Sequence, residues 1–384
     1  MQEKDNWRRY CLSPQEALDG NEVELLRGGE EAFPAMLSAI AGARRYVLLE
    51  FYAFADDSTG RAVADLLRRK AKEGVAVYLI YDSVGSIGTD RSFILSLAAA
   101  GVRVSEFRPV IYWKPYWNWI KRDHRKTVCV DGLAGFVGGF NITESDAPRS
   151  MGGRGWKDTA ARVSGPALPG IETLFWEAWT ASTPVGGPQA PCLPLSEPAR
   201  SGGKRAAVVS ASGIRNVRSI RRTYSYAIDR ALEYIYITNA YFMPDKLVLR
   251  RLIEAARRGV DVRIIGPRET DHPYVRWASW AIFGRLIKNG VRVYEWEGPI
   301  LHSKTAVIDG IWSSVGSHNL DHRSLQYNLE VNVNIYDRPF GAAMTRAFRE
   351  DLKKSRQVTI KDVKNRPFAA KAASRLLYMF RSWG

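Results

Sequence analysis

Two stretches of this sequence, HRKTVCVD at residues 124–131 and HSKTAVID at residues 302–309, share one pattern and decide the fold. In each stretch a His is followed by Lys two residues later and by Asp seven residues later. Seven residues after each Asp a second shared run begins, GGFN at 138–141 and GSHN at 316–319. Two copies with the same internal spacing predict a chain of two related halves, because a repeated pattern marks a repeated structural unit.

The spacing between His and Lys predicts a shared pocket. Val, Ile, Thr and Cys follow the His in these stretches, which favours β-strands. Side chains two positions apart on a strand project from one face, so His124 and Lys126 are expected to reach one pocket. His302 and Lys304 are expected to do the same in the second half.

The Asp residue of each motif has a different predicted role. Asp131 and Asp309 lie an odd number of residues from their His, so on a continuing strand they point away from the pocket. We therefore assign a structural role to both.

The runs after the motifs complete the predicted pocket. Glycine allows the backbone to approach a ligand closely, and an Asn amide can donate hydrogen bonds to an oxyanion. Gly139 and Asn141 in the first run, with Ser317 and Asn319 in the second, are therefore assigned to phosphate binding. Two imidazoles, two ammonium groups and two amides together predict a site for a phosphoryl group.

The rest of the chain predicts an α/β fold with two similar halves, each a mixed, largely parallel sheet flanked by helices. Runs with apolar residues at helical spacing lie at 60–74 and 246–259, and each ends in Gly. Matching strand-like runs lie at 46–49, 74–77 and 101–104 and again at 234–237, 259–262 and 290–293. We expect an N-terminal half at 1–183, a linker rich in Pro, Gly and Ser at 184–204, and a C-terminal half at 205–384. The active site is expected in the cleft between the halves.

The paired HxKxxxxD motifs, with GSHNLDHRSLQYNLEVN at 316–332 and WKDTAARVSGPA in the first half, resemble the phospholipase D superfamily and its bacterial cardiolipin synthase branch. The resemblance covers most of residues 21–340. It implies that one His attacks a phosphodiester to form a phosphohistidine while the other protonates the leaving alcohol, after which an acceptor alcohol or water resolves the intermediate. The implied nucleophile is His124 and the implied acid is His302, while Lys and Asn stabilise the developing charge. Neither a metal nor another cofactor is implied.

The resemblance also implies that a carboxylate further along the chain orients each His. Matching the motifs assigns Asp158, in WKD, to the first half and Glu330, in NLEVN, to the second. A carboxylate on the far ring nitrogen fixes the tautomer of an imidazole and favours its charged form. The alternative is that both residues are surface acids. His318 and His322 lack counterparts in the first half and are expected to be packing or surface residues.

Composition predicts an anionic partner. The formal net charge is +16 at pH 7, which favours anionic lipid headgroups or nucleic acid. Aromatic and cationic residues interleave in the segment 111–122, which favours a membrane interface, with base stacking on single-stranded nucleic acid or a packed loop as alternatives. The tail 369–384 is predicted to be a basic amphipathic helix that lies on a membrane or docks on the protein. The residues assigned to membrane contact are Trp113, Trp117, Trp119, Trp277, Trp280, Phe380 and Trp383.

The expected activity is the one that the resemblance implies. A phosphatidyl group moves from one phosphatidylglycerol to a hydroxyl of a second, which releases glycerol and makes cardiolipin. The alternatives are a phospholipase D-type hydrolase, another headgroup exchanger such as phosphatidylserine synthase, a phosphodiesterase acting on nucleic acid, and a non-catalytic membrane scaffold. Nucleic acid is a less favoured partner than phospholipid. No apolar run approaches the roughly 18–20 residues of a spanning helix, no signal peptide is visible, and the three Cys are scattered. We therefore expect a peripheral protein on the cytoplasmic face of the cell membrane.

Overall fold

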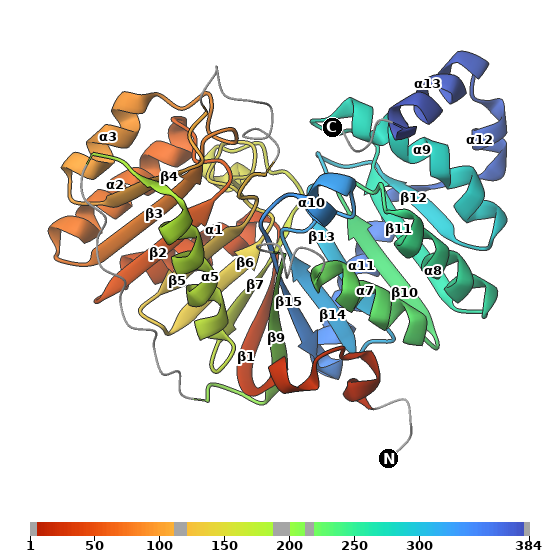
Figure 1. Cartoon of the computed structure of the whole chain (residues 1–384), viewed down its shortest axis with the longest axis horizontal. Coiled ribbons are helices and arrows are strands. Elements are labelled where there is room, and N and C mark those ends of the chain that lie inside the picture. Colours follow the sequence, from red (N-terminus) through yellow and green to blue (C-terminus); the bar gives the residue numbers. More distant parts are fainter. Residues whose placement is uncertain (1–5, 111–120, 187–199, 212–218, 380–384) are drawn as a thin grey trace.

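In this computed structural model the chain forms two similar α/β halves that share one continuous sheet (Figure 1). The structure describes residues 6–110, 121–186, 200–211 and 219–379. The strands of the first half are β1 (Leu18–Arg27), β2 (Tyr46–Phe51), β3 (Ala76–Asp82), β4 (Arg103–Phe107), β5 (Lys126–Val130), β6 (Ala134–Gly138), β7 (Thr159–Ser164) and β8 (Thr183–Pro184). Those of the second half are β9 (Lys204–Ala211), β10 (Tyr234–Asn239), β11 (Asp261–Pro267), β12 (Arg292–Trp296), β13 (Lys304–Ile308), β14 (Trp312–Gly316), β15 (Glu330–Tyr336) and β16 (Ser355–Val358).

Helices cover both faces of this sheet. The helices of the first half are α1 (Gly29–Ala41), α2 (Ser58–Lys72), α3 (Arg91–Ala99) and α5 (Leu168–Ala181). Those of the second half are α7 (Ser219–Arg230), α8 (Lys246–Arg257), α9 (Pro273–Lys288), α10 (His322–Gln326), α11 (Arg338–Lys353), α12 (Ile360–Asn365) and α13 (Phe368–Met379). Short 3-10 turns lie at Trp7–Tyr10, Pro14–Glu16 and Arg149–Met151.

The helix after the first parallel strand of each half begins and ends in the same way. Asp57 precedes α2 and Asp245 precedes α8, and their carboxylates accept hydrogen bonds from the N–H three residues later at 2.8 and 2.9 Å. Such a cap satisfies an N–H group that has no partner inside the helix. Gly74 and Gly259 follow the two helices with φ of +87° and +93°, a left-handed conformation that glycine adopts without steric cost.

The sheet is mixed, as predicted, and its strand order is β16-β12-β11-β10-β13-β14-β15-β9-β1-β7-β6-β5-β2-β3-β4-β8. Parallel pairing occurs in β2–β3–β4 and in β10–β11–β12. The other neighbouring strands of the described residues are antiparallel, so the parallel share is smaller than expected. The reason is that the strand after each motif returns through a tight hairpin, β5–β6 and β13–β14, and a tight hairpin joins only antiparallel strands.

Asp131 and Asp309 build these hairpin turns. They have φ of +54° and +52°, and each is followed by a Gly with positive φ, the Asp-Gly pair that favours tight hairpins. The Asp131 carboxylate accepts hydrogen bonds from the backbone N–H groups of residues 44–46 at 2.7, 2.8 and 2.7 Å. The Asp309 carboxylate binds those of residues 232–234 at 2.7, 2.8 and 2.7 Å. Each carboxylate therefore ties its hairpin to the start of the neighbouring strand, β2 or β10.

Asp131→Asn and Asp309→Asn are expected to destabilise the fold more than they change the chemistry. An amide offers one oxygen where a carboxylate offers two, so at least one N–H group loses a charged acceptor, which costs about 1–3 kcal/mol. We expect Tm to fall by about 2–4 °C for each kcal/mol lost, with kcat of the folded protein nearly unchanged. Thermal melts run beside kinetics check this, and a variant that melts like the wild type but has no activity contradicts the structural role.

Hydrophobic burial joins the two halves. On one face of the sheet α5 and α11 cover a core that contains residues of both halves. On the other face α1, α2 and α3 cover a core of the first half, and α7, α8 and α9 cover a core of the second. Strands β1 and β9 pair at the junction. Separating the halves would expose the shared core to water, which the hydrophobic effect opposes.

The first described residues of the chain pack on the second half. Tyr10 and Cys11 are buried in the core beneath α7 and α8. The Tyr10 hydroxyl donates a hydrogen bond to Asp309 Oδ2 at 2.8 Å. The start of the chain therefore reinforces the hairpin that carries the second motif.

Two further expectations concern the linker between the halves and the absence of a membrane-spanning helix. Most of the predicted linker, 187–199, lies outside the described residues, so it stays a prediction. In the part of the chain that the structure describes, no helix has the length and apolar character needed to cross a bilayer.

Candidate active site

The two motif histidines lie at the junction of the halves. His124 and His302 precede β5 and β13 by two residues, in segments that pair with the opposite half. The His124 N–H donates to the carbonyl oxygen of Leu329 at 3.0 Å, and the His302 N–H donates to that of Lys157 at 2.8 Å. Both imidazoles line one cavity of about 430 Å³. The two copies of the motif therefore meet in a single site.

Each imidazole receives a carboxylate from the opposite half. His124 Nδ1 lies 3.0 Å from Oε1 and 3.2 Å from Oε2 of Glu330, and His302 Nδ1 lies 2.8 Å from Oδ2 of Asp158. Both carboxylates are fully buried, so they are not surface acids. The assignment of each carboxylate to the His of its own half was wrong. The reason is that the backbone of each motif pairs with the other half: Leu329, which accepts the His124 N–H, directly precedes Glu330, and Lys157, which accepts the His302 N–H, directly precedes Asp158.

Gly139 and Ser317 lie behind these carboxylates, which corrects their assignment to phosphate binding. The Ser317 hydroxyl donates to Glu330 Oε2 at 2.5 Å. A Cβ at Gly139 would lie 2.2 Å from Asp158 Oδ2, so only glycine lets that carboxylate pack there. The Gly139 N–H donates to the carbonyl oxygen of Thr159 at 3.3 Å and is thus already used. Both residues position the carboxylates that orient the histidines.

Asn141 and Asn319 line the cavity beside the imidazoles. Asn141 Oδ1 accepts a hydrogen bond from the Ala53 N–H at 3.2 Å, and its Nδ2 donates to Asp146 Oδ2 at 3.4 Å. Asn319 Oδ1 has no hydrogen-bond partner among the described residues. An unsatisfied buried polar group costs free energy, so this carboxamide is suited to bind a ligand in the cavity.

Lys126 and Lys304 are buried next to the histidines. Lys126 Nζ donates to the carbonyl oxygen of His124 at 2.7 Å, and Lys304 Nζ donates to that of His302. Burial lowers the pKa of Lys126 to about 7 and also lowers the pKa of Lys304. An anionic phosphate in the cavity would favour the charged form of both lysines, because opposite charges attract strongly away from water.

The surroundings of His124 favour a neutral ring. Burial, followed by the positive charges of Lys126 and Lys304, holds the pKa of His124 well below its usual value. A neutral imidazole whose Nδ1 proton is held by Glu330 leaves Nε2 unprotonated. That is the form that a nucleophile needs.

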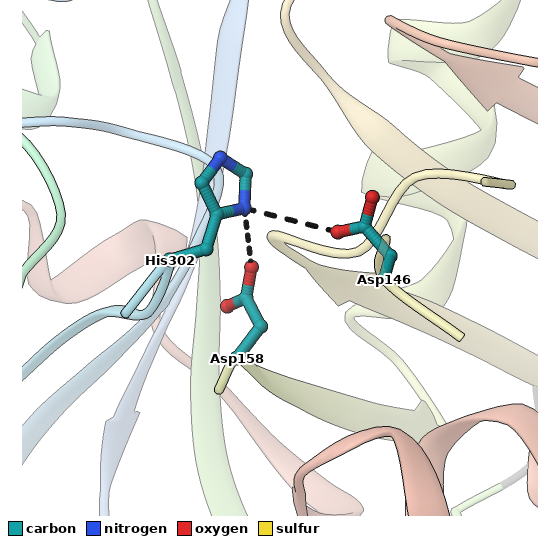
Figure 2. A group of neighbouring side chains, drawn as sticks. All are labelled: Asp146, Asp158 and His302. Atoms are coloured by element: carbon teal, nitrogen blue, oxygen red, sulfur yellow. Dashed lines mark hydrogen bonds and ion pairs between the residues drawn. The ribbon is translucent and has the colours of Figure 1, made fainter. Parts of the chain in front are cut away.

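Figure 2 shows a second carboxylate beside His302, from a residue that the sequence pattern does not reveal. Asp146 Oδ1 lies 3.9 Å from His302 Nδ1, the same nitrogen that Asp158 contacts. Asp146 has no acidic counterpart in the second half, where Ser324 takes the equivalent place after GSHN, so the repeat gives no signal for it. A proton on His302 therefore faces two carboxylates, whereas one on His124 faces only Glu330.

Asp146, Asp158 and His302 also form the one group in the described part of the chain that could hold a metal ion, with ligand atoms within 4.8 Å of one another. One of its carboxylates, that of Asp158, already has two partners. His302 contacts Asp158, and Lys304 Nζ lies 3.7 Å from Asp158 Oδ2. A metal ion would have to displace the imidazole from its carboxylate and lie beside a buried ammonium group. The set therefore fits an oriented imidazole better than a metal centre.

Aromatic side chains flank both histidines. The Tyr52 ring lies 5.1 Å from that of His124, and the rings of Tyr241 and Trp156 lie 6.2 and 5.7 Å from that of His302. Tyr52 directly follows β2, and Tyr241 lies two residues after the end of β10. The starts of β2 and β10 differ by 188 residues (234 − 46), so a strict alignment of the halves pairs Tyr52 with Ala240 and misses this correspondence by one residue.

The residues assigned to membrane contact divide into three groups. Trp113, Trp117, Trp119, Phe380 and Trp383 lie outside the described residues, so their assignment stays a prediction. Trp277 on α9 is 41% exposed. Trp280 on the same helix is 8% exposed, and its indole N–H donates to Glu295 Oε1 at 3.1 Å. Its side chain faces the core toward β12, so the structure removes Trp280 from the membrane-contact set.

Comparison with known proteins identifies relatives that match most of this chain. The family model described as cardiolipin synthase, PLD-like domain, matches residues 36–151 and 224–352. Cardiolipin synthase A of Pseudomonas putida (strain GB-1) is 34% identical over 351 residues, which cover 91% of this chain and 72% of that protein. Cardiolipin synthase 1 of Staphylococcus epidermidis (strain ATCC 35984) is 33% identical over 369 residues, which cover 94% of this chain and 74% of that protein.

A solved structure shares the fold. The crystal structure of phosphatidylserine synthase from Haemophilus influenzae Rd KW20 has a TM-score of 0.71 to this chain at 12% sequence identity. The match covers 93% of this chain and 92% of that one. With the family model and the curated relatives, the comparison leads to one conclusion: the chain belongs to the cardiolipin synthase family of phospholipase-D-like proteins.

Proposed function

We propose that the protein is a phosphatidyltransferase that makes cardiolipin from two molecules of phosphatidylglycerol through a phosphohistidine. One observation carries the proposal: His124 and His302 line one cavity, and each is oriented by a carboxylate of the opposite half. Such a pair can divide nucleophilic attack and proton transfer between its members. The lipid substrate is supported by the relatives named cardiolipin synthase.

The first chemical step breaks the donor lipid. Nε2 of His124 attacks the phosphorus of the donor phosphatidylglycerol and forms a P–N bond. The bond between phosphorus and the glycerol oxygen breaks, and His302 gives its proton to that oxygen as glycerol leaves. Asp158 and Asp146 stabilise His302 while it carries the proton.

The second step reverses the roles. The hydroxyl of a second phosphatidylglycerol attacks phosphorus and gives its proton to His302, while the P–N bond breaks and His124 is restored. Cardiolipin is the product. Water in place of the hydroxyl would give phosphatidic acid through the same residues, so exclusion of water from the cavity determines which product forms.

The charge that develops on the phosphoryl oxygens needs stabilisation in both steps. Asn141 and Asn319 border the cavity, and Lys126 and Lys304 lie behind the two histidines. Preorganised donors and positive charges in a site shielded from water contribute strongly to such reactions. These four residues therefore serve as the phosphate-stabilising set.

We further propose that the protein acts as a peripheral protein at the cytoplasmic face of the cell membrane. The formal net charge of +16 favours attraction to anionic phospholipid. The substrate, phosphatidylglycerol, is itself such a lipid.

Reconstitution tests the proposed reaction directly. Purified protein is incubated with vesicles of phosphatidylglycerol, and the lipid products and free glycerol are measured, with the His124→Ala variant as control. We expect cardiolipin and glycerol in equal amounts from the wild type and neither from the variant. Phosphatidic acid without cardiolipin would identify a hydrolase, and product that appears only when another alcohol is added would identify a different headgroup exchanger.

Removal of divalent ions is expected to leave this reaction intact. The site has its own side-chain cations in Lys126, Lys304 and the cavity-lining Arg323, and Asp158 already contacts His302 and Lys304. Dialysis against EDTA, followed by assay with matched vesicles, should therefore leave turnover within about twofold of the untreated protein. Activity that is lost on dialysis and restored by one divalent ion would instead place a metal at the Asp146, Asp158 and His302 group.

A further inference from the structure

The last helices of the chain form a basic groove outside the catalytic cavity. Helices α12 and α13 pack on α9 at the outer end of the second half (Figure 1). A groove of about 550 Å³ lies between them. Its charged lining residues are all cationic: Arg285, Lys288, Lys364, Arg366, Lys371 and Arg375.

A second groove continues this surface along α13. It has a volume of about 710 Å³ and is bordered by α8, α9 and α13. Its charged lining residues are also cationic, namely Lys246, Arg250 and Arg285. No Asp or Glu lines either groove in the described part of the chain, although acids make up a large share of the sequence. Clustered charge of one sign creates a potential that attracts a ligand of the opposite sign.

Apolar side chains stand exposed beside the cationic ones. Phe368, Leu376 and Met379 on α13 are 84%, 55% and 71% exposed, and Trp277 on α9 is exposed as well. Exposed apolar groups next to basic groups match a bilayer surface, where rings and alkyl chains enter the headgroup region and cations meet lipid phosphates. Nucleic acid would use the charge but offers no place for Leu376 and Met379.

Polar and aromatic contacts hold the groove in shape. The Arg366 guanidinium lies 4.6 Å from the ring centroid of Trp280 and donates a hydrogen bond to the buried Ser374 hydroxyl at 3.0 Å. Lys371 Nζ donates to the carbonyl oxygen of Lys364 at 2.6 Å. These contacts join α9, α12 and α13, so the cationic groups are presented on a folded surface and not on a loose tail.

One of these helices, α9, also forms part of the wall of the catalytic cavity. Tyr274 and Val275, at the start of α9, line that cavity. Leu377 and Tyr378 of α13 pack against the cluster that contains Val275. From Val275 to Arg285 the helix advances about 15 Å, so a membrane on the groove lies close to the site that must receive its lipids.

We infer that the grooves beside α13 form a docking site for the phosphate headgroups of an anionic bilayer, separate from the catalytic cavity. The lipid phosphates meet the cations of the grooves, and the exposed side chains of α13 enter the headgroup layer. The inference rests on the proposed attachment to anionic phospholipid and deepens it, because it names the surface that meets the lipid.

The test removes three exposed cations that line the groove and do not line the catalytic cavity, in the triple variant Lys288→Gln/Lys364→Gln/Arg375→Gln. The matched control removes three exposed cations of the first half, Arg44→Gln/Arg69→Gln/Lys72→Gln, so both variants have the same net charge. Binding is measured by flotation with vesicles of phosphatidylglycerol and of phosphatidylcholine. We expect the groove variant to bind phosphatidylglycerol vesicles about 10²-fold more weakly than the wild type, and the control to lose less than about threefold.

A second readout separates docking from chemistry. With phosphatidylglycerol dispersed in detergent, the groove variant should turn over at the wild-type rate, whereas turnover on vesicles should fall with binding. Wild-type protein that makes no cardiolipin in detergent would refute the proposed reaction and leave the binding comparison valid. A groove variant that binds vesicles like the wild type, or a control that loses as much, overturns the docking site. Single-stranded DNA that binds the wild type through these residues while vesicles do not would overturn it in favour of nucleic acid.

A milder variant guards against misfolding of the triple change. Lys364→Glu alone should weaken vesicle binding by about tenfold, because it both removes and reverses one charge. Phe368→Ser/Leu376→Ser should preserve binding at low salt but lose the part that remains at high salt, since salt screens charge and not apolar insertion. Unchanged binding in both variants, with unchanged melting temperature, contradicts docking at this surface.

Discussion

His124→Ala and His302→Ala are each expected to reduce transfer from phosphatidylglycerol by at least about 10⁴-fold. The first change removes the proposed nucleophile, and without it the P–N bond cannot form. The second removes the proton donor for glycerol, a poor leaving group as an alkoxide. Steady-state assays on detergent-dispersed phosphatidylglycerol measure both losses, and thermal melts show whether the variants remain folded.

An activated donor assigns the two roles. Phosphatidyl-p-nitrophenol has a leaving group that departs without a proton, so His302→Ala should still form the phosphohistidine and release a burst of p-nitrophenolate. His124→Ala should release none. Acid quench and mapping of the phosphorylated peptide should place the phosphate on His124. Phosphate on His302 would exchange the roles, and robust transfer by either Ala variant would contradict the paired mechanism.

Glu330→Gln and Asp158→Asn are expected to reduce transfer by roughly 10²-fold to 10⁴-fold, the range seen when the carboxylate that orients a catalytic His becomes an amide. Because each carboxylate contacts the His of the opposite half, the two variants should differ in whether they release a burst from the activated donor. Glu330→Gln affects His124, so the activated donor should not restore the burst. Asp158→Asn affects His302, so the burst should return.

Asp351, a carboxylate that pairs with a lysine and not with a His, serves as the control for the Glu330 and Asp158 variants. Asp351 Oδ1 contacts Lys157 Nζ at 3.1 Å and touches neither His. Asp351→Asn should therefore change transfer by less than about threefold. A burst that returns in Glu330→Gln and not in Asp158→Asn would mean that each carboxylate serves the His of its own half.

Much of the fold could be predicted because its signals are local. The spacing of apolar residues and the closing Gly of α2 and α8 lie within single segments, so the repeat exposed both helices and the parallel strands beside them. The hairpins β5–β6 and β13–β14 were also visible in principle. Asp-Gly follows each motif at 131–132 and 309–310, and that pair favours the tight turn that makes these strands antiparallel.

The site could be predicted only as far as the repeat describes it. His124, His302 and the two Asn residues recur at equal spacing, and the structure places them at one cavity. Which half supplies each carboxylate depends on how the halves face one another, which spacing along the chain does not encode. Asp146 occurs in one half only, so a comparison of the halves passes over it.

The long sequence separation of these contacts sets the order in which a newly made chain becomes active. The hydrogen bond from Tyr10 to Asp309 can form only after 299 further residues have been synthesised. The contact between His124 and Glu330 likewise requires 206 further residues. A chain that ends between the two motifs therefore lacks the carboxylate that orients His124. Unfinished chains should thus be unable to attack the membrane lipids around them.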